Sequence, residues 1–224
     1  MVNILLEGYD IGADCLYDEL KEYIKPTSSV AVVAFSFRDE RVKSISDWNL
    51  LYSRENGKYY KGITDGLMSY GIPEENVTFI NYFSDTKESA KKKIEKADIV
   101  YFTGGLPDRM MERIEEFDMY DVLTEFNGIV MGYSAGALIQ LSEYHITPDE
   151  DYSEFKYYKG LPYLNDFYLE VHYEGAEIQN DSIQRVIAER GKPVYATVLG
   201  NGAMLIDNGN IKLIGNVETY NKYQ

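Results

Sequence analysis

The stretch that decides the expected fold runs from Ile129 to Ile139 and reads IVMGYSAGALI. An apolar run that meets Gly-x-Ser-x-Gly and then a second apolar run is typical of a buried strand turning sharply into a helix. Such a turn presents Ser134 above the strand end, where the first N–H groups of the helix point. The stretch therefore indicates an α/β fold with Ser134 as a candidate nucleophile, the alternative being a serine that only caps the helix.

Short apolar runs, several of them β-branched, recur on both sides of this stretch and are typical of strands buried on both faces of a parallel sheet. The expected strands are Val2–Leu6, Val30–Phe35, Val77–Ile80, Ile99–Phe102, Ile129–Tyr133, Tyr168–Val171, Val194–Val198, Met204–Ile206 and Ile211–Ile214. The expected helices are Asp14–Tyr23, Tyr59–Tyr70, Lys87–Lys96, Arg109–Glu116, Ala135–Leu141 and Ile178–Arg190. This alternation predicts a three-layer α/β sandwich with a mainly parallel, flavodoxin-like sheet.

The C-terminal part of the pattern differs from the rest. Its three expected strands are separated by Gly-Asn-Gly at residues 200–202 and Asp-Asn-Gly-Asn at residues 207–210. Because Asn-Gly in a tight loop favours a hairpin, we expect the sheet to finish with antiparallel strands. The acidic and Tyr-rich residues 149–163 are expected to form a long surface excursion.

Composition bounds the class of protein. A chain of 224 residues fits one α/β domain spanning residues 1–224. A net charge of −15 argues against binding to nucleic acid or to an anionic membrane. No segment has the run of about 20 apolar residues that a membrane helix needs. Whether the chain is a monomer or a homodimer is left open.

The N-terminus and the cysteine content bear on the compartment. Residues Met1–Leu6 form a short apolar run without a basic region, so we interpret them as a first strand instead of a signal peptide. Cys15 is the one cysteine, which excludes an intramolecular disulfide and a cysteine-based zinc site, and we interpret it as structural. A cytoplasmic location is expected.

A serine nucleophile needs a base, and the two histidines of the chain are His145 and His172. His172 ends an expected strand, and parallel α/β sheets place their functional crevice outside the carboxyl ends of strands. His172 is therefore the better candidate, whereas His145 follows the helix of Ser134 and is expected to be structural. Several acidic residues lie nearby in sequence, and spacing does not choose among them.

A second loop is expected to approach Ser134. The expected strand Ile99–Phe102 runs into Thr103-Gly104-Gly105-Leu106-Pro107, and paired glycines let the backbone come close to a ligand. The Ala135 N–H at the helix start is a natural oxyanion donor. The sequence has no dinucleotide fingerprint, phosphate loop or His-Glu-x-x-His zinc site, so no cofactor or metal is expected.

These residues together resemble peptidase family S51, which contains dipeptidase E and cyanophycinase and has a class I glutamine amidotransferase-like fold with Ser in place of Cys. The matching elements are the Gly-Gly loop after Phe102, the segment Gly132–Ala137, and Phe167–His172. The resemblance extends over nearly the whole chain in the order of its elements.

The resemblance implies roles for individual residues. Ser134 would be the nucleophile and His172 the base. The family's acid would fall on Asp149, with Glu150 as the alternative that cyanophycinase-like members suggest. The oxyanion hole would be formed by the backbone N–H groups of Gly105 and Ala135.

Two departures from the family pattern concern the substrate. The glycine loop reads Gly-Gly-Leu-Pro-Asp, which changes the lining around Gly104. Dipeptidase E also has a Thr-Arg-x-x-Arg element, and here Ser182 replaces its first Arg while Arg185 remains. Because a guanidinium is the natural bidentate partner of a carboxylate, an aspartyl substrate is not expected. Gly104 and Arg185 remain candidate substrate-binding residues.

The sequence therefore predicts a serine-type peptidase that hydrolyses short peptides or isopeptides through a Ser-His-Asp/Glu triad and an acyl-enzyme. One alternative is an esterase or amidase acting on other acyl compounds with the same triad. Another is a non-catalytic binding or regulatory protein on the same scaffold.

Overall fold

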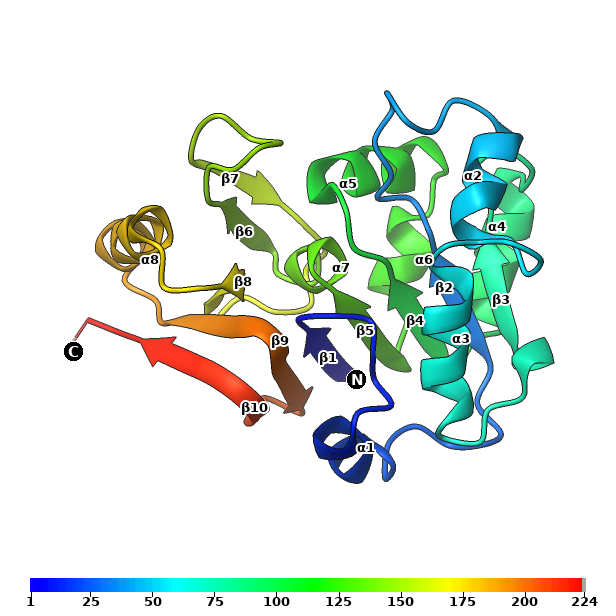
Figure 1. The fold of residues 1–224 in the computed structure, drawn as a ribbon, viewed down its shortest axis with the longest axis horizontal. Helices are drawn as coiled ribbons and strands as arrows, with labels where there is room; N and C mark the ends of the chain where they lie inside the picture. The colour runs from blue at the N-terminus through cyan, green and yellow to red at the C-terminus, as the bar shows by residue number, and fades with distance from the viewer. Residues whose placement is uncertain (223–224) are drawn as a thin grey trace.

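The computed structural model describes residues 1–222, apart from the side chain of Asn201. Within these residues an eight-stranded sheet has the order β10-β9-β1-β5-β4-β2-β3, and β8 pairs with β9 (Figure 1). The strands of this sheet are β1 (Val2–Leu6), β2 (Val30–Val33), β3 (Val77–Ile80), β4 (Ile99–Phe102), β5 (Ile129–Tyr133), β8 (Tyr168–Tyr173), β9 (Val194–Asp207) and β10 (Asn210–Tyr220). Strands β1 to β5 pair in parallel, and β9 is antiparallel to both β1 and β10.

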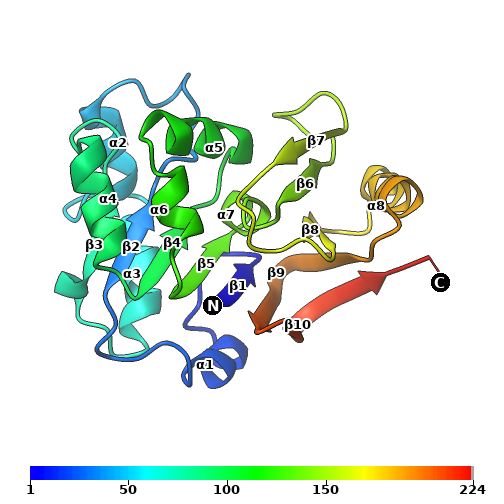
Figure 2. The same ribbon diagram turned by 180° about the vertical axis from the view of Figure 1, so that it is seen from behind.

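Helices cover both faces of the parallel part, as Figures 1 and 2 show from opposite sides. The helices are α1 (Asp14–Leu20), α2 (Ile45–Tyr52), α3 (Tyr60–Met68), α4 (Lys87–Glu95), α5 (Pro107–Glu116), α6 (Tyr120–Thr124), α7 (Ala135–Leu138) and α8 (Glu177–Arg190). Alternate strand residues enter two buried clusters: Leu5 packs with α4 to α7, and Ile4 packs with α1 and α3. This alternation is what a two-residue side-chain period produces in a sheet covered on both faces.

The predicted fold class is confirmed, since the structure is a mostly parallel sheet between helices with an antiparallel hairpin at the C-terminal end. The predicted bounds of β1, β3, β4 and β5 match the structure residue for residue. Helices α2 and α6 were not predicted. The buried side of α2 is formed by Trp48 and Tyr52, which are spaced four residues apart on one face of the helix.

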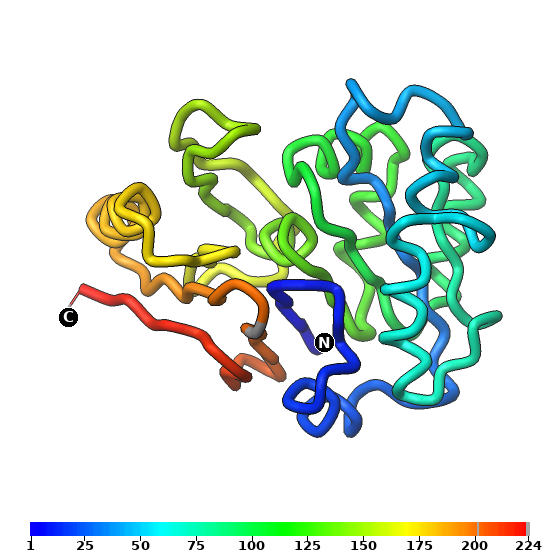
Figure 3. Tube along the Cα trace, in the orientation of Figure 1, coloured from blue at the N-terminus to red at the C-terminus, as the bar shows by residue number. Residues whose placement is uncertain are grey.

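The prediction of two separate strands at Val194–Val198 and Met204–Ile206 is wrong. Strand β9 continues through both and bends between its halves (Figure 3). Its first half pairs with β8, and its second half pairs with β1. Gly-Asn-Gly therefore marks a change of pairing partner, while Asn208 and Gly209, both with positive φ, form the real hairpin turn between β9 and β10.

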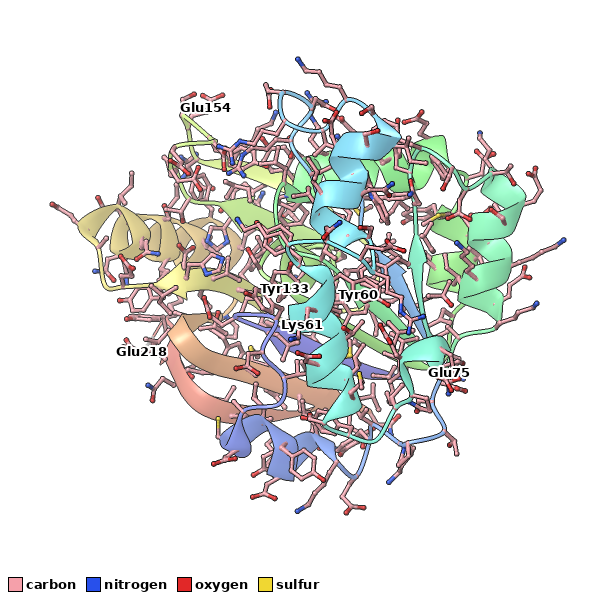
Figure 4. The ribbon with its side chains drawn as sticks, turned by 45° about the vertical axis from the view of Figure 1, so that its right-hand side comes forward. Tyr60, Lys61, Glu75, Tyr133, Glu154 and Glu218 are labelled. Atoms are coloured by element: carbon pink, nitrogen blue, oxygen red, sulfur yellow. The ribbon has the colours of Figure 1, made fainter. Side chains whose placement is uncertain are left out.

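The expected long excursion at residues 149–163 is in part a second, two-stranded sheet. Strands β6 (Glu143–Ile146) and β7 (Lys156–Lys159) form an antiparallel pair that stands beside α8 (Figure 1). The loop between these strands carries Asp149 to Glu154, and Figure 4 shows Glu154 at its outer end. Among residues 1–222, no helix is both long and apolar enough to cross a membrane.

Candidate active site

Ser134 lies between β5 and α7 in a strained backbone conformation, with φ 52° and ψ −116°. A non-glycine residue with positive φ is uncommon, and at a strand-to-helix turn it lifts the side chain clear of the sheet. The flanking glycines are required by close packing, since a Cβ at Gly132 or Gly136 would collide with backbone atoms of Gly136 or Phe102. The predicted sharp turn at Ser134 is therefore present.

His172 lies near the end of β8, where the pairing with β9 is interrupted. The register shifts between Glu170 and Tyr173, so that β8 has one residue more than β9 over this interval. His172 itself has φ 53°, a left-handed conformation. A bulge of this kind re-aims a side chain. It directs the ring of His172 toward Ser134.

Three side chains form a hydrogen-bonded chain across the ends of three strands. The Ser134 Oγ atom lies 2.8 Å from His172 Nε2, and His172 Nδ1 is hydrogen-bonded to the carboxylate of Glu7. Glu7 follows β1 directly, and its other carboxylate oxygen accepts the Gly200 N–H at 3.0 Å. Gly200 lies between the part of β9 that pairs with β8 and the part that pairs with β1, and it contacts Glu7 from there.

The environment of Glu7 favours its charged form. Burial alone would raise the pKa of this carboxyl, but the hydrogen bonds from His172 and from the Gly200 N–H outweigh it, and the pKa lies below its ordinary value. An ionised carboxylate on Nδ1 holds the imidazole in the tautomer whose Nε2 can accept a proton from Ser134.

Asp149 is not the carboxylate that contacts His172. Its Oδ1 atom accepts the backbone N–H groups of Asp151 and Tyr152, which fixes the turn after β6. Glu150 is exposed in the same turn. Both residues belong to the β6–β7 loop, whereas Nδ1 of His172 faces the end of β1. The sequence signal for Glu7 was a charged residue directly after the mostly apolar strand β1.

The Gly-Gly loop after β4 lies next to Ser134. Gly105 has φ 141°, and a Cβ there would collide with the carbonyl oxygen of Ser36. The Ser36 hydroxyl donates to the Gly104 carbonyl at 2.5 Å, and the Leu106 N–H donates to the Ser36 carbonyl at 2.8 Å. Within the described residues, the N–H groups of Gly105 and Ala135 donate to no protein acceptor. Both are free to bind a ligand at Ser134.

The remaining predicted substrate-binding residues occupy different places. Gly104 packs against the Tyr133 ring and the Ser134 Cβ. Because it has no side chain, the loop can approach Ser134 closely. Arg185 does not line the cavity at Ser134, because it pairs with Glu189 and lies over the Phe155 ring. Ser182 is a buried residue of α8, and its hydroxyl donates to the Ile178 carbonyl, a position without room for an arginine.

A cavity of about 370 Å³ opens beside Ser134. It is lined by Gly105, Pro107, Ser134, Ala135, Leu138, His145, Ile146, Thr147, Pro148, Asp149, Asp151, Tyr152, Leu169, Glu170, Val171, His172, Glu174, Ala176, Ile178 and Gln179. This size suits a small ligand. No group of three or more His, Cys, Asp or Glu residues within residues 1–222 is arranged to hold a metal ion.

His145 is buried at the side of this cavity. Its Nε2 atom lies 2.8 Å from the Glu170 carboxylate, and the Thr147 hydroxyl donates to the same oxygen at 2.8 Å. Its ring stacks on Phe155. His145 has no contact with Ser134, in keeping with its expected structural place.

The comparison with known families agrees with the geometry. The model of peptidase family S51 matches residues 52–214. The chain belongs to this family. Membership makes it a peptidase by family, as the sequence predicted. No curated protein sequence matches the chain.

Two solved structures are similar to the fold. A provisionally named peptidase E protein from Listeria monocytogenes EGD-e superposes with a TM-score of 0.67 at 18% identity, covering 96% of this chain and 98% of the other. A peptidase from an acI-B1 actinobacterium superposes with a TM-score of 0.65 at 11% identity, covering 100% of this chain and 95% of the other. At these identities the likeness extends to the fold alone.

Proposed function

We propose that the protein is a serine peptidase that hydrolyses short peptides or isopeptides through Ser134, His172 and Glu7. The observation that carries the proposal is the continuous hydrogen-bonded chain from the Gly200 N–H through Glu7 and His172 to Ser134 Oγ. A nucleophile, a base and an acid that orients the base are the parts that acyl transfer needs.

In the first half of the reaction, Ser134 Oγ attacks the scissile carbonyl while His172 Nε2 takes the hydroxyl proton. The negative charge that develops on the carbonyl oxygen is stabilised by the N–H groups of Gly105 and Ala135. The tetrahedral intermediate then collapses, the C–N bond breaks, and His172 donates its proton to the leaving amine. An ester on Ser134 remains.

In the second half, water replaces the amine. His172 removes a proton from the water as it attacks the ester carbonyl, and the same oxyanion donors act again. The proton returns to Ser134 Oγ as the C–O bond breaks, which releases the acid and restores the enzyme. Glu7 stays ionised throughout and stabilises the imidazolium.

A fluorophosphonate probe tests the nucleophile directly. Wild-type protein should be labelled and Ser134→Ala should not, while a panel of dipeptides and p-nitrophenyl esters separates peptidase from esterase activity. Equal labelling of both proteins, or labelling of neither, would contradict the proposal. Turnover of the esters without any peptide hydrolysis would favour the non-peptide hydrolase.

A further inference from the structure

The cavity at Ser134 has an unbalanced charge. Carboxylates of Asp149, Asp151, Glu170 and Glu174 line it, and no Lys or Arg does. Asp151 is paired with Arg38, which neutralises it from outside the cavity. Exposed acidic residues are expected in a chain of this net charge and therefore say little about the ligand. The chemistry of the ligand is better inferred from the buried residues that line the cavity.

Glu170 is the buried carboxylate of the lining, with 5% of its surface exposed. One of its oxygens, Oε2, accepts from both His145 and Thr147. Within the described residues its other oxygen, Oε1, accepts no hydrogen bond. Because this residue lines the cavity, a ligand there can supply a donor to its carboxylate, and a hydrogen bond to a charged group is stronger than one between neutral groups.

The neighbours of Glu170 add further acceptors. In the tautomer that donates from Nε2 to Glu170, Nδ1 of His145 is an acceptor. This Nδ1 atom is buried and has no partner among the described residues. The hydroxyl hydrogen of Thr147 is already donated to Glu170. The side chains at this wall therefore offer acceptors, and a ligand group that complements them is a hydrogen-bond donor with positive charge.

Part of the cavity lining is apolar and includes Leu138, Ile146 and Leu169. A lysine or arginine side chain combines an apolar stem with a cationic head, which suits a cavity lined by apolar side chains and a buried carboxylate. An aspartyl side chain would instead meet Glu170 with like charge and without an arginine partner, since Arg185 is engaged by Glu189.

We propose that Glu170 binds a cationic group of the peptide substrate, an ammonium or a guanidinium, in the cavity beside Ser134. The inference rests on the proposed function, because it assumes a peptide whose scissile carbonyl lies at Ser134. It makes Glu170 a specificity-determining residue, supported by His145 and Thr147.

The test measures binding without turnover. Ser134→Ala protein is titrated by calorimetry with Lys-Leu, Arg-Leu, norleucyl-Leu, Asp-Leu and N-acetyl-Lys-Leu. Lys-Leu should bind about 10- to 100-fold more tightly than the peptide that lacks the bound cation, which is norleucyl-Leu for a side-chain ammonium and N-acetyl-Lys-Leu for the α-ammonium, as expected for hydrogen bonds to a charged group. Adding Glu170→Gln should remove this preference. The matched control Glu154→Gln, on the outer loop seen in Figure 4, should keep it.

The peptide series distinguishes the sources of the cation. If N-acetylation weakens binding and norleucine does not, and Glu170→Gln abolishes the difference, the bound cation is the α-ammonium group and the inference holds. Equal binding of all five peptides, tighter binding of Asp-Leu, or a preference that survives Glu170→Gln would overturn it. Because the peptide series itself needs no variant at Glu170, equal binding or tighter binding of Asp-Leu overturns the inference even where Glu170→Gln fails to fold.

Fluorophosphonate labelling of otherwise unaltered Glu170→Gln protein reports on Ser134 separately. Labelling as in wild type together with equal peptide binding overturns the inference about Glu170 and leaves the proposed function standing. Absence of Ser134-dependent labelling in wild type contradicts the proposed function, whatever the peptides do.

Discussion

Two hydrogen-bonded histidine–glutamate pairs in this molecule differ in their exposure and in the partner of the second ring nitrogen. His145 and Glu170 are both buried, with the histidine side chain 0% exposed. The side chain of His172 is 46% exposed, and its Nε2 atom contacts Ser134. The Glu7 side chain that contacts its Nδ1 atom is buried. The comparison teaches that the partner of the second ring nitrogen separates the two pairs. Nδ1 of His145 has no hydrogen-bond partner within residues 1–222, whereas Nε2 of His172 contacts the Ser134 hydroxyl.

The largest expected effect separates the two histidines. His172→Ala should lower kcat for peptide hydrolysis about 10⁶-fold, because the base that activates Ser134 is lost. His145→Gln should leave kcat for p-nitrophenyl acetate within about three-fold, since it lies away from the reacting atoms. Steady-state kinetics on both variants checks this. Comparable losses of kcat in two folded variants would contradict the assignment.

The next effect separates the carboxylates. Glu7→Gln should lower kcat about 10⁴-fold, because the neutral amide no longer holds the tautomer or stabilises the imidazolium. Asp149→Asn should change kcat by less than about three-fold, since the Asp149 carboxylate only accepts backbone N–H groups of its own loop. Ester kinetics measured in parallel would identify the acid. A larger loss in Asp149→Asn than in Glu7→Gln would return the role to Asp149.

A smaller effect concerns the Gly-Gly loop after β4, which contains Gly104 and Gly105. Ser36→Ala removes the hydroxyl that donates to the Gly104 carbonyl. The loop should then be held less firmly next to Ser134. We expect kcat to fall about 10-fold, with KM nearly unchanged, because a misplaced donor affects the transition state more than substrate binding. Ser182→Ala, a buried serine on α8 that donates to its own helix, is the matched control. A rise in KM alone would place Ser36 in substrate binding.

The smallest effect is on stability and depends on pH. The folded-state pKa of Glu7 is lowered, so its charge stabilises the fold above the ordinary carboxyl value near 4.5, and this stabilisation is lost as pH falls through the folded-state pKa. The difference in melting temperature between wild type and Glu7→Gln should therefore shrink on acidification below pH 4.5. Thermal unfolding from pH 3 to pH 7 measures it. A difference that grows on acidification would mean that the carboxyl is protonated in the fold.

Much of the scaffold could be predicted because its parallel strands are continuous apolar runs. The predicted strands Ile99–Phe102 and Ile129–Tyr133 match the structure. The glycines around Ser134 indicated a tightly packed strand-to-helix turn, which is present. We predicted that His172 lies near Ser134 from its place at a strand end, and the two side chains are hydrogen-bonded. These features are local, and local patterns are what a single sequence displays.

The carboxylate that contacts His172 could not be predicted, because its position depends on strand order. Glu7 reaches His172 only since β1 and β8 both pair with β9, on either side of its bend. A single sequence carries no signal for which strands are neighbours. The same bend was mistaken for a turn, because Gly-Asn-Gly suits a hairpin as well as a change of partner.

The anchor of Glu7 on Gly200 has a consequence for the timing of activity during protein synthesis. The two residues are 193 positions apart, and Ser134 and His172 are both made before Gly200. A growing chain on the ribosome contains Ser134 and His172 well before the bend in β9 exists to align them with Glu7. Under the proposed mechanism, unfinished chains therefore lack an activated serine, and the protein is inert toward its neighbours until its last strands are in place.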